Sequence, residues 1–142
     1  MDDENYEQWS LIFTCVERDS FMYNEFVKWL DKILDKNIPL PGIALNFNLY
    51  EDDDSQWSIQ IISSAEFDEE DPDWCCDEMF SSGEDLFTWK CNMGWEEILD
   101  VSCDMIRKYL TEGKYADELK KYEGIAAGFV DGDLEILYTK DK

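Results

Sequence analysis

Residues Ile43-Ala-Leu-Asn-Phe-Asn-Leu-Tyr50 decide the fold class, because their side chains alternate between apolar and mainly polar with a period of two. The odd-numbered side chains face one way and the even-numbered ones face the other. An acidic turn, Glu51-Asp-Asp-Asp-Ser55, follows, and Trp57 to Ser63 resumes the extended pattern. The stretch therefore predicts a β-hairpin with one apolar face and an acidic tip.

Two further extended segments are predicted nearer the C-terminus. Leu86 to Cys91 has the length and composition of a short strand. Ile125 to Thr139 predicts a second hairpin, since Asp131-Gly132 stands between two extended runs and glycine tolerates the positive φ of a type I′ turn. Gly128 within the first run indicates a bulge or the close approach of another element.

Helical periodicity precedes the first hairpin. Tyr6 to Val16 predicts a short amphipathic helix, although the same run is compatible with a strand. Arg18-Asp-Ser20 is expected to interrupt it and to supply the cap of a second helix. That second helix has one apolar stripe from Met22 and should end near Asn37, before Pro39 forbids its continuation.

The strongest helical pattern lies between the two hairpins. Gly94 opens it, and the residues from Trp95 to Tyr109 place their apolar side chains, Trp95 included, on one stripe. Gly113 supplies a plausible C-cap. A shorter helix is expected from about Tyr115 to Tyr122.

The order of these segments predicts an α+β fold. We expect a mainly antiparallel sheet of about five strands, with the N-terminal helices and the central helical pair packed on it. A chain of 142 residues suits one domain with a single core, and no linker divides residues 1–142. The hydrophobic fraction of 44% and the aromatic fraction of 15% argue against a disordered chain.

The charge limits the classes of partner. Lys+Arg number 12 against 35 Asp+Glu, for a net charge of -23. Such a field repels nucleic acid and anionic membranes, so we expect no direct binding to either, whereas it attracts basic proteins. A general solubility charge explains the same number equally well. Because no signal-peptide pattern and no membrane-spanning apolar run is found, we expect a cytoplasmic chain. We also expect a monomer or a weak homo-oligomer.

An acidic tract, Phe67-Asp-Glu-Glu-Asp-Pro-Asp-Trp-Cys-Cys-Asp-Glu-Met-Phe80, comes directly after the first hairpin. It carries carboxylates and no cation between large apolar side chains. We expect Phe67, Trp74 and Phe80 to point inward as anchors, while the carboxylates contact a partner. The predicted partner-binding residues, which chain order suggests form one patch, are Asp52, Asp53, Asp54, Asp68, Glu69, Glu70, Asp71, Asp73 and Asp77.

Catalytic and metal-binding motifs are not found. The chain has no histidine, so its serines lack a base, and its five cysteines include no C-x-x-C pair that would indicate zinc. Neither acidic stretch fits an EF-hand loop. We therefore expect buried or half-buried free thiols, no metal, no cofactor and no enzyme. A carboxylate-dependent hydrolase stays a residual alternative.

Four segments resemble a known family: Phe47-Asn-Leu-Tyr-Glu51, Phe67-Asp-Glu-Glu-Asp-Pro-Asp-Trp-Cys-Cys-Asp-Glu78, Tyr109-Leu-Thr-Glu-Gly-Lys-Tyr115 and Gly128-Phe-Val-Asp-Gly-Asp-Leu134. They are similar to small acidic immunity proteins of bacterial polymorphic toxin and contact-dependent inhibition systems, over most of the chain from Ile43 onward. The resemblance implies a cytosolic antidote that binds and blocks a cognate toxin domain, often a nuclease with a basic cleft. The alternative is a nucleic-acid mimic that inhibits a DNA-binding or restriction protein.

Overall fold

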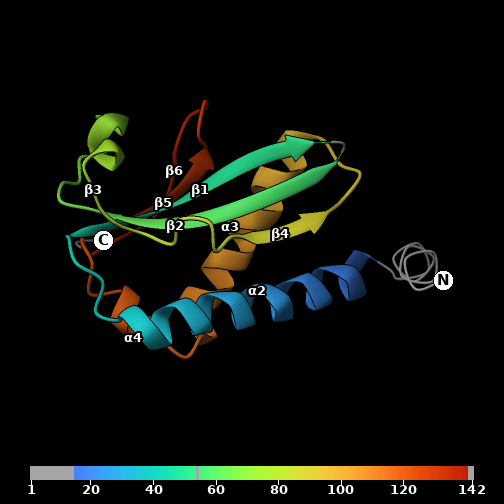
Figure 1. Cartoon of the computed structure of the whole chain (residues 1–142), viewed down its shortest axis with the longest axis horizontal. Coiled ribbons are helices and arrows are strands. Elements are labelled where there is room, and N and C mark those ends of the chain that lie inside the picture. The colour runs from blue at the N-terminus through green and yellow to red at the C-terminus, as the bar shows by residue number, and fades with distance from the viewer. Residues whose placement is uncertain (1–14, 54, 141–142) are drawn as a thin grey trace.

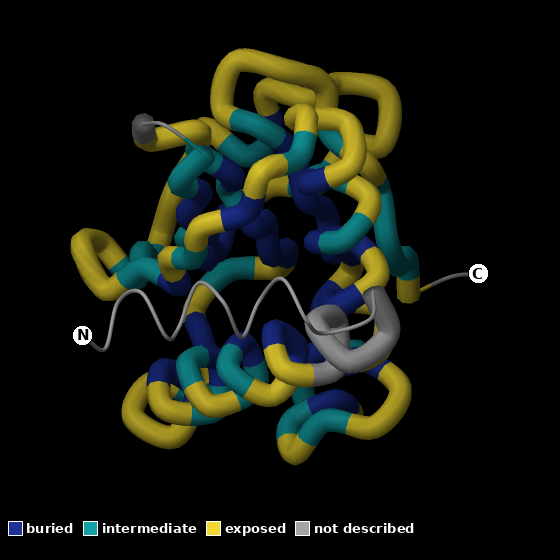
Figure 2. Tube along the Cα trace, turned by 90° about the vertical axis from the view of Figure 1, so that its right-hand side faces the viewer, coloured by how far each residue is buried: buried dark blue, intermediate teal, exposed yellow. Residues whose placement is uncertain are grey.

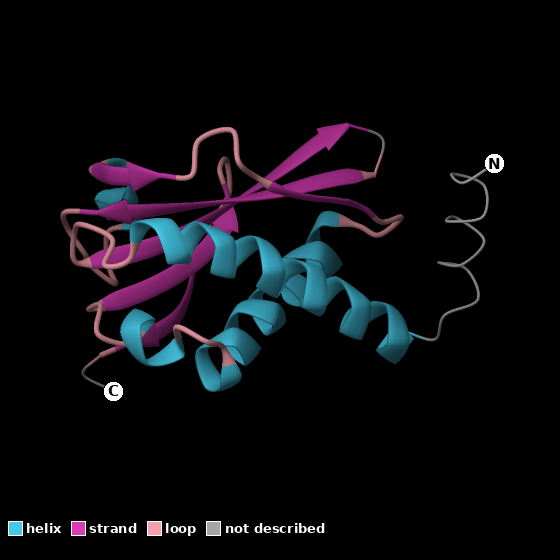
Figure 3. Cartoon of the chain, turned by 60° about the horizontal axis from the view of Figure 1, so that its bottom comes forward, coloured by secondary structure: helices cyan, strands magenta, loops and turns pink. Residues whose placement is uncertain are grey.

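Figure 1 shows the computed structural model, which describes residues 15–53 and 55–140, the side chains of 15–20 and of Asp53 excepted. A layer of helices covers one face of a six-stranded sheet (Figure 3). In chain order the elements are α2 (Cys15–Asn37), β1 (Ala44–Asp53), β2 (Gln56–Ser64), the 3-10 helix η1 (Pro72–Cys76), β3 (Glu78–Ser81), β4 (Phe87–Lys90), α3 (Trp95–Glu112), α4 (Ala116–Leu119), β5 (Gly124–Phe129) and β6 (Glu135–Thr139).

The sheet has the order β3-β2-β1-β5-β6, and β4 pairs with the other half of β2. The predicted hairpin is confirmed: β1 and β2 pair antiparallel from Ala44↔Ser64 to Asp53↔Gln56. β5 pairs parallel to β1, because the chain crosses the sheet through α3 and α4 before it enters β5. The α+β class is thus confirmed, with six strands in place of about five and one parallel pair in a mostly antiparallel sheet.

Helix α2 differs from the prediction at its start. It runs without interruption from Cys15 to Asn37, so the expected break and cap at Arg18-Asp-Ser20 are wrong. Aspartate and serine lower helix stability by less than about 0.7 kcal/mol each, too little to stop a helix whose later turns pack on the sheet. The end at Asn37 is confirmed. The helix predicted from Tyr6 lies mainly outside the described residues.

The core lies between the helices and the face of the sheet that carries Phe47 (Figure 2). Leu45, Phe47 and Leu49 of β1 contact it as predicted, but Ile43 precedes the strand and is 37% exposed. Phe26 of α2 reaches the sheet, with its ring centroid 6.3 Å from that of Phe47 and 5.6 Å from that of Phe87. Each fully buried side chain of this size contributes about 1.5–3 kcal/mol, so the helices are held mainly by apolar burial.

The opposite side of the sheet, called the outer face here, carries the even-numbered side chains of β1. Asn46 donates to Asn48 at 2.6 Å, and Asn48 donates to Gln60 at 3.0 Å. Tyr50 donates to the same Gln60 oxygen at 3.0 Å. Asn46 is fully buried and its Oδ1 atom has no hydrogen-bond partner among the described residues, whereas the Asn48 and Tyr50 side chains are joined through Gln60. The outer face is therefore polar along β1 and is not a second large core.

The second hairpin forms with a different turn from the one predicted. Residues 130–134 connect β5 and β6, and Gly132 does not have a positive φ, so the type I′ turn is wrong. The loop instead folds back over Gly128, where an added Cβ would stand 2.5 Å from the Asp133 carbonyl oxygen. The predicted close approach at Gly128 is confirmed. The short helix α4 is also shorter than the expected 115–122 range.

We expect Gly128→Ala to lower the free energy of unfolding by about 1–3 kcal/mol, because the new methyl group overlaps backbone that cannot rotate away. Gly132→Ala is the matched control, since its Cβ would meet nothing closer than 3.7 Å; we expect a change within about 0.5 kcal/mol. Urea denaturation measures both. Equal stability of the two variants would show that the 130–134 loop does not rest on β5.

Candidate partner-binding surfaces

The acidic tract is anchored on the outer face by two aromatic rings. Trp74 is 3% exposed and lies on Ala44 and Ala126, and the Phe67 ring packs against it edge-on with centroids 5.1 Å apart. A side chain at Gly124 would overlap the Phe67 ring, so a strand with small residues on its outer face makes room for both aromatics. Phe67 and Trp74 therefore point inward as predicted, but toward the outer face and away from the main core.

Local hydrogen bonds shape the tract between its anchors. The Asp68 carboxylate accepts the Glu70 N–H at 2.9 Å, and the Asp71 carboxylate accepts the Asp73 N–H at 3.1 Å, which caps η1. Ser64 of β2 donates to the Trp74 carbonyl at 2.5 Å. Two of the predicted partner-binding carboxylates thus also define the turns of the tract. All six predicted tract residues, at 68–71, 73 and 77, are exposed.

The hairpin tip is far from the tract, so the predicted single patch is wrong. The tract begins after Ser64, which pairs with Ala44, whereas Asp53 pairs with Gln56 at the other end of the hairpin. At about 3.4 Å per residue the two ends are separated by about 27 Å, and Figure 1 shows η1 and the tip at opposite ends of the sheet. Chain order failed because β2 carries the chain the full strand length away from the tip. Asp54 and the Asp53 side chain lie outside the described residues.

A groove lies at the end of the sheet where the hairpin tip is. It has a volume of about 940 Å³ and is formed by the end of β1, the first turns of α3 and the loop between β5 and β6. Its walls carry carboxylates and no cation: Glu51, Glu96, Asp100, Asp131, Asp133 and Glu135. Sequence reasoning missed this site, because its residues come from segments that only the parallel β1–β5 pairing and α3 bring together.

Trp95 is the most exposed aromatic feature of the groove. It was predicted on the buried stripe of α3, but its side chain is 55% exposed. Trp95 is the first residue of α3, and its ring meets Phe129 edge-on with centroids 6.2 Å apart, leaving the rest of the indole open. Val130, at 56% exposure, lies in the same groove. The sequence signal that could have indicated this groove is the run Val130-Asp-Gly-Asp133, in which an apolar residue stands directly beside acidic ones.

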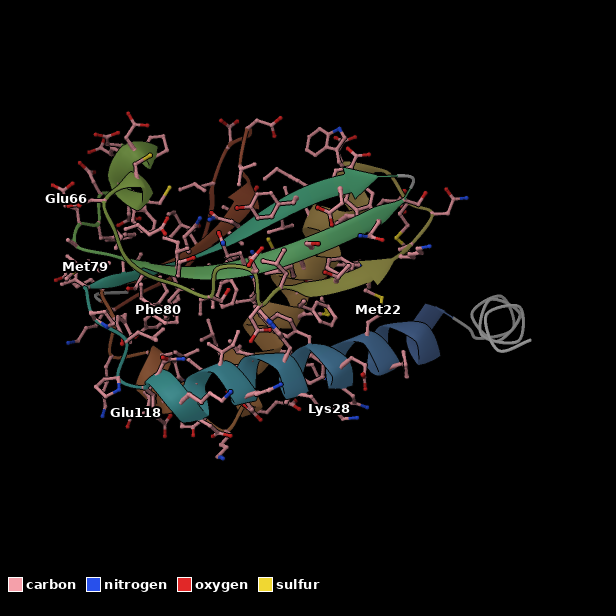
Figure 4. All side chains as sticks on the ribbon, viewed as in Figure 1. Met22, Lys28, Glu66, Met79, Phe80 and Glu118 are labelled. Carbon is pink, nitrogen blue, oxygen red and sulfur yellow. The ribbon has the colours of Figure 1, made fainter. Side chains whose placement is uncertain are left out.

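The cations are segregated from both acidic surfaces. From residue 37 to residue 94, a span that includes β1–β4 and the tract and ends before α3, the sequence has fourteen carboxylates and one cation, Lys90. Lys28, Arg107 and Lys121 form ion pairs with nearby carboxylates on the helices. Figure 4 shows Lys28 on α2 and Glu66 beside the tract, on opposite sides of the molecule. The charge of the chain is therefore polarised between the helical layer and the sheet.

The thiols and carboxylates of the described residues do not form a metal centre, because no group of three or more potential ligands is placed to hold an ion. Cys91 and Cys103 are buried and Cys75 is half-buried, but Cys76 is exposed, which corrects the expectation of buried or half-buried thiols. Burial raises the pKa of Cys103 to about 11. In the described part of the chain, no helix has the length and apolar character needed to cross a membrane.

Comparisons of the chain with protein-family models, with curated proteins and with solved structures found no match. The two acidic surfaces contain exposed carboxylates on an ordered support with aromatic side chains beside them, a composition that is electrostatically complementary to cationic groups. The groove lining offers no nucleophile paired with a base.

We expect Trp74→Ala to destabilise the chain by about 3 kcal/mol and to release the tract, because the ring fills the space over Ala44 and Ala126. Endoproteinase Glu-C should then cleave after Glu69 and Glu70 faster than in the wild type. Trp95→Ala, an equally large truncation at an exposed ring, should cost about 1 kcal/mol or less. Unchanged cleavage in Trp74→Ala would mean that the tract is held by other contacts.

We expect Cys76 to react with Ellman's reagent in a rapid phase at pH 8, since it is exposed, whereas Cys103 is buried and stays protonated with its pKa of about 11. Cys76→Ser should remove one equivalent of that phase. Cys103→Ser should leave the rapid phase unchanged, and a loss there would contradict the burial of this thiol.

Proposed function

We propose that this chain is an inhibitor of the immunity-protein kind, which binds a basic toxin domain in the bacterial cytoplasm and blocks its cationic site. The polarised charge carries the proposal: residues 37–94 hold fourteen carboxylates and one cation, whereas the ion-paired cations lie on the opposite layer. A net negative charge that served solubility alone would not require the cations to be separated from the carboxylates in this way. The resemblance of four segments to immunity proteins supports the same class.

The rigidity of the tract favours binding over simple solvation. Phe67 and Trp74 fix residues 67 and 74 of the tract on the sheet, and the turns at Asp68 and Asp71 fix the chain between them. A surface ordered before it meets its partner loses less conformational entropy on binding. Its carboxylates also steer a cationic partner toward this end of the molecule, an effect that salt weakens.

A basic protein suits this charge better than a nucleic acid or a metal ion does. Phosphates are repelled by the field of the sheet side. Nuclease clefts, in contrast, are lined with cations that hold phosphates, and an acidic protein surface can occupy them directly. Blocking by occupation needs no catalytic group on the inhibitor, which agrees with a chain that has no histidine.

The test mixes the chain with the protein encoded beside its gene, by surface plasmon resonance at 50 and 500 mM NaCl. Glu70→Lys, Asp73→Lys and Asp77→Lys together should slow association about 10- to 100-fold at low salt. These three carboxylates are chosen because the side-chain hydrogen bonds that shape the tract come from Asp68 and Asp71. The control triple of Asp104→Lys, Glu112→Lys and Asp117→Lys makes the same change of charge on the helical layer. It should slow association less than about threefold.

Three results would contradict the proposal in different ways. An absence of any complex at low salt removes the inhibitor function for that partner. Equal slowing by both triples assigns the effect to net charge alone. Binding to several unrelated DNA-binding proteins, with displacement by DNA, supports the nucleic-acid mimic instead.

A further inference from the structure

We propose that the groove between β1, α3 and the 130–134 loop is the docking site for a peptide segment in which lysine or arginine alternates with apolar residues. The inference deepens the proposed function and rests on it, because it assigns the anchoring segment of a basic partner to a surface at the other end of the hairpin from the tract. No residue of the acidic tract lines this groove.

The shape of the groove is the first observation. Its volume of about 940 Å³ lies near the upper end of the range of about 300–1,000 Å³ for ligand-binding clefts. Glu51 comes from β1, Asp100 from α3 and Asp133 from the loop, so the carboxylates converge on one space from three segments. Carboxylates on every wall give the groove a negative potential, which favours a cationic occupant.

The apolar surface is the second, independent observation, and it favours a binding site over a merely solvated acidic surface. Trp95 and Val130 are each more than half exposed in the same groove. The Trp95 ring is held by Phe129, and Phe129 is held by Trp57 of the core with centroids 5.9 Å apart. An exposed indole fixed in this way is a ready surface for an ammonium or guanidinium group, for which tryptophan is the best aromatic partner.

These two observations select the chemistry of the occupant. An anionic or nucleic-acid ligand would meet carboxylates on every wall. A metal ion is not indicated, since no three ligands of the described residues converge on a point. A purely apolar segment would leave the carboxylates partly desolvated without partners. A segment that offers both cations and apolar side chains satisfies the carboxylates, Trp95 and Val130 together.

The probe is the synthetic hexapeptide acetyl-Leu-Arg-Val-Lys-Leu-Arg-amide, titrated into the intact chain by calorimetry at 50 mM NaCl. A neutral analogue replaces arginine by citrulline and lysine by acetyl-lysine, and spermine tests charge without apolar groups. We expect the cationic peptide to bind at least about tenfold more tightly than either control compound. Equal binding of the neutral analogue, or of spermine, would overturn the proposed chemistry.

Matched variants locate the binding. Trp95→Ala should weaken the peptide about tenfold or more, and Trp95→Phe should restore part of the loss. Asp100→Asn should weaken the affinity for the peptide severalfold and reduce the salt dependence of that affinity. Asp104→Asn, one turn further along α3 and outside the groove lining, should change it less than about twofold. Equal effects of the two asparagine variants, or an unchanged affinity of Trp95→Ala with intact circular dichroism, would overturn the site.

The outcome also separates this inference from the proposed function. If the chain binds the neighbouring gene product and Trp95→Ala binds it equally well, the groove is not the anchor and the inhibitor function stands. If the peptide binds in the groove but the neighbouring protein does not bind at all, the groove stands and the inhibitor function falls.

Discussion

The pairing of β1 with β2 on one side and β5 on the other is the constraint on which the rest of the molecule depends. It gives the sheet an apolar face, which the helices cover, and an outer face with small and polar side chains. β2, the antiparallel partner of β1, leads to the tract, and β5, its parallel partner, places the 130–134 loop beside β1. Both acidic surfaces are consequences of this one arrangement of strands.

Local patterns were sufficient for much of the fold. The alternation from Ile43 to Tyr50 predicted β1 and the face that packs on the helices, and the prolines after Asn37 predicted where α2 ends. In both cases the determining interactions lie within a few residues of each other. The Gly128 approach was also predictable, because few other roles explain a glycine within an apolar strand.

Interactions between distant segments were not predictable in the same way. The pairing of Ala44 with Gly124 joins residues whose local patterns say nothing about each other, so the parallel pair and the groove beside it were missed. Trp95 was placed on the buried stripe by periodicity, but the first turn of a helix can extend beyond the element it packs on. Of the candidate site, the exposed carboxylates of the tract were predicted. The distance that separates them from Asp52 was not, because it depends on the length of β2.

The outer face of β5 supports both acidic surfaces at once. Gly124 lies under Phe67 of the tract, and Gly128 lies under the loop that forms one wall of the groove. Residues in these loops project into solvent and can change charge or length while the strand beneath them stays the same. The chain thus separates a fixed platform from replaceable recognition segments. Such a division allows new partners to be matched without redesign of the core.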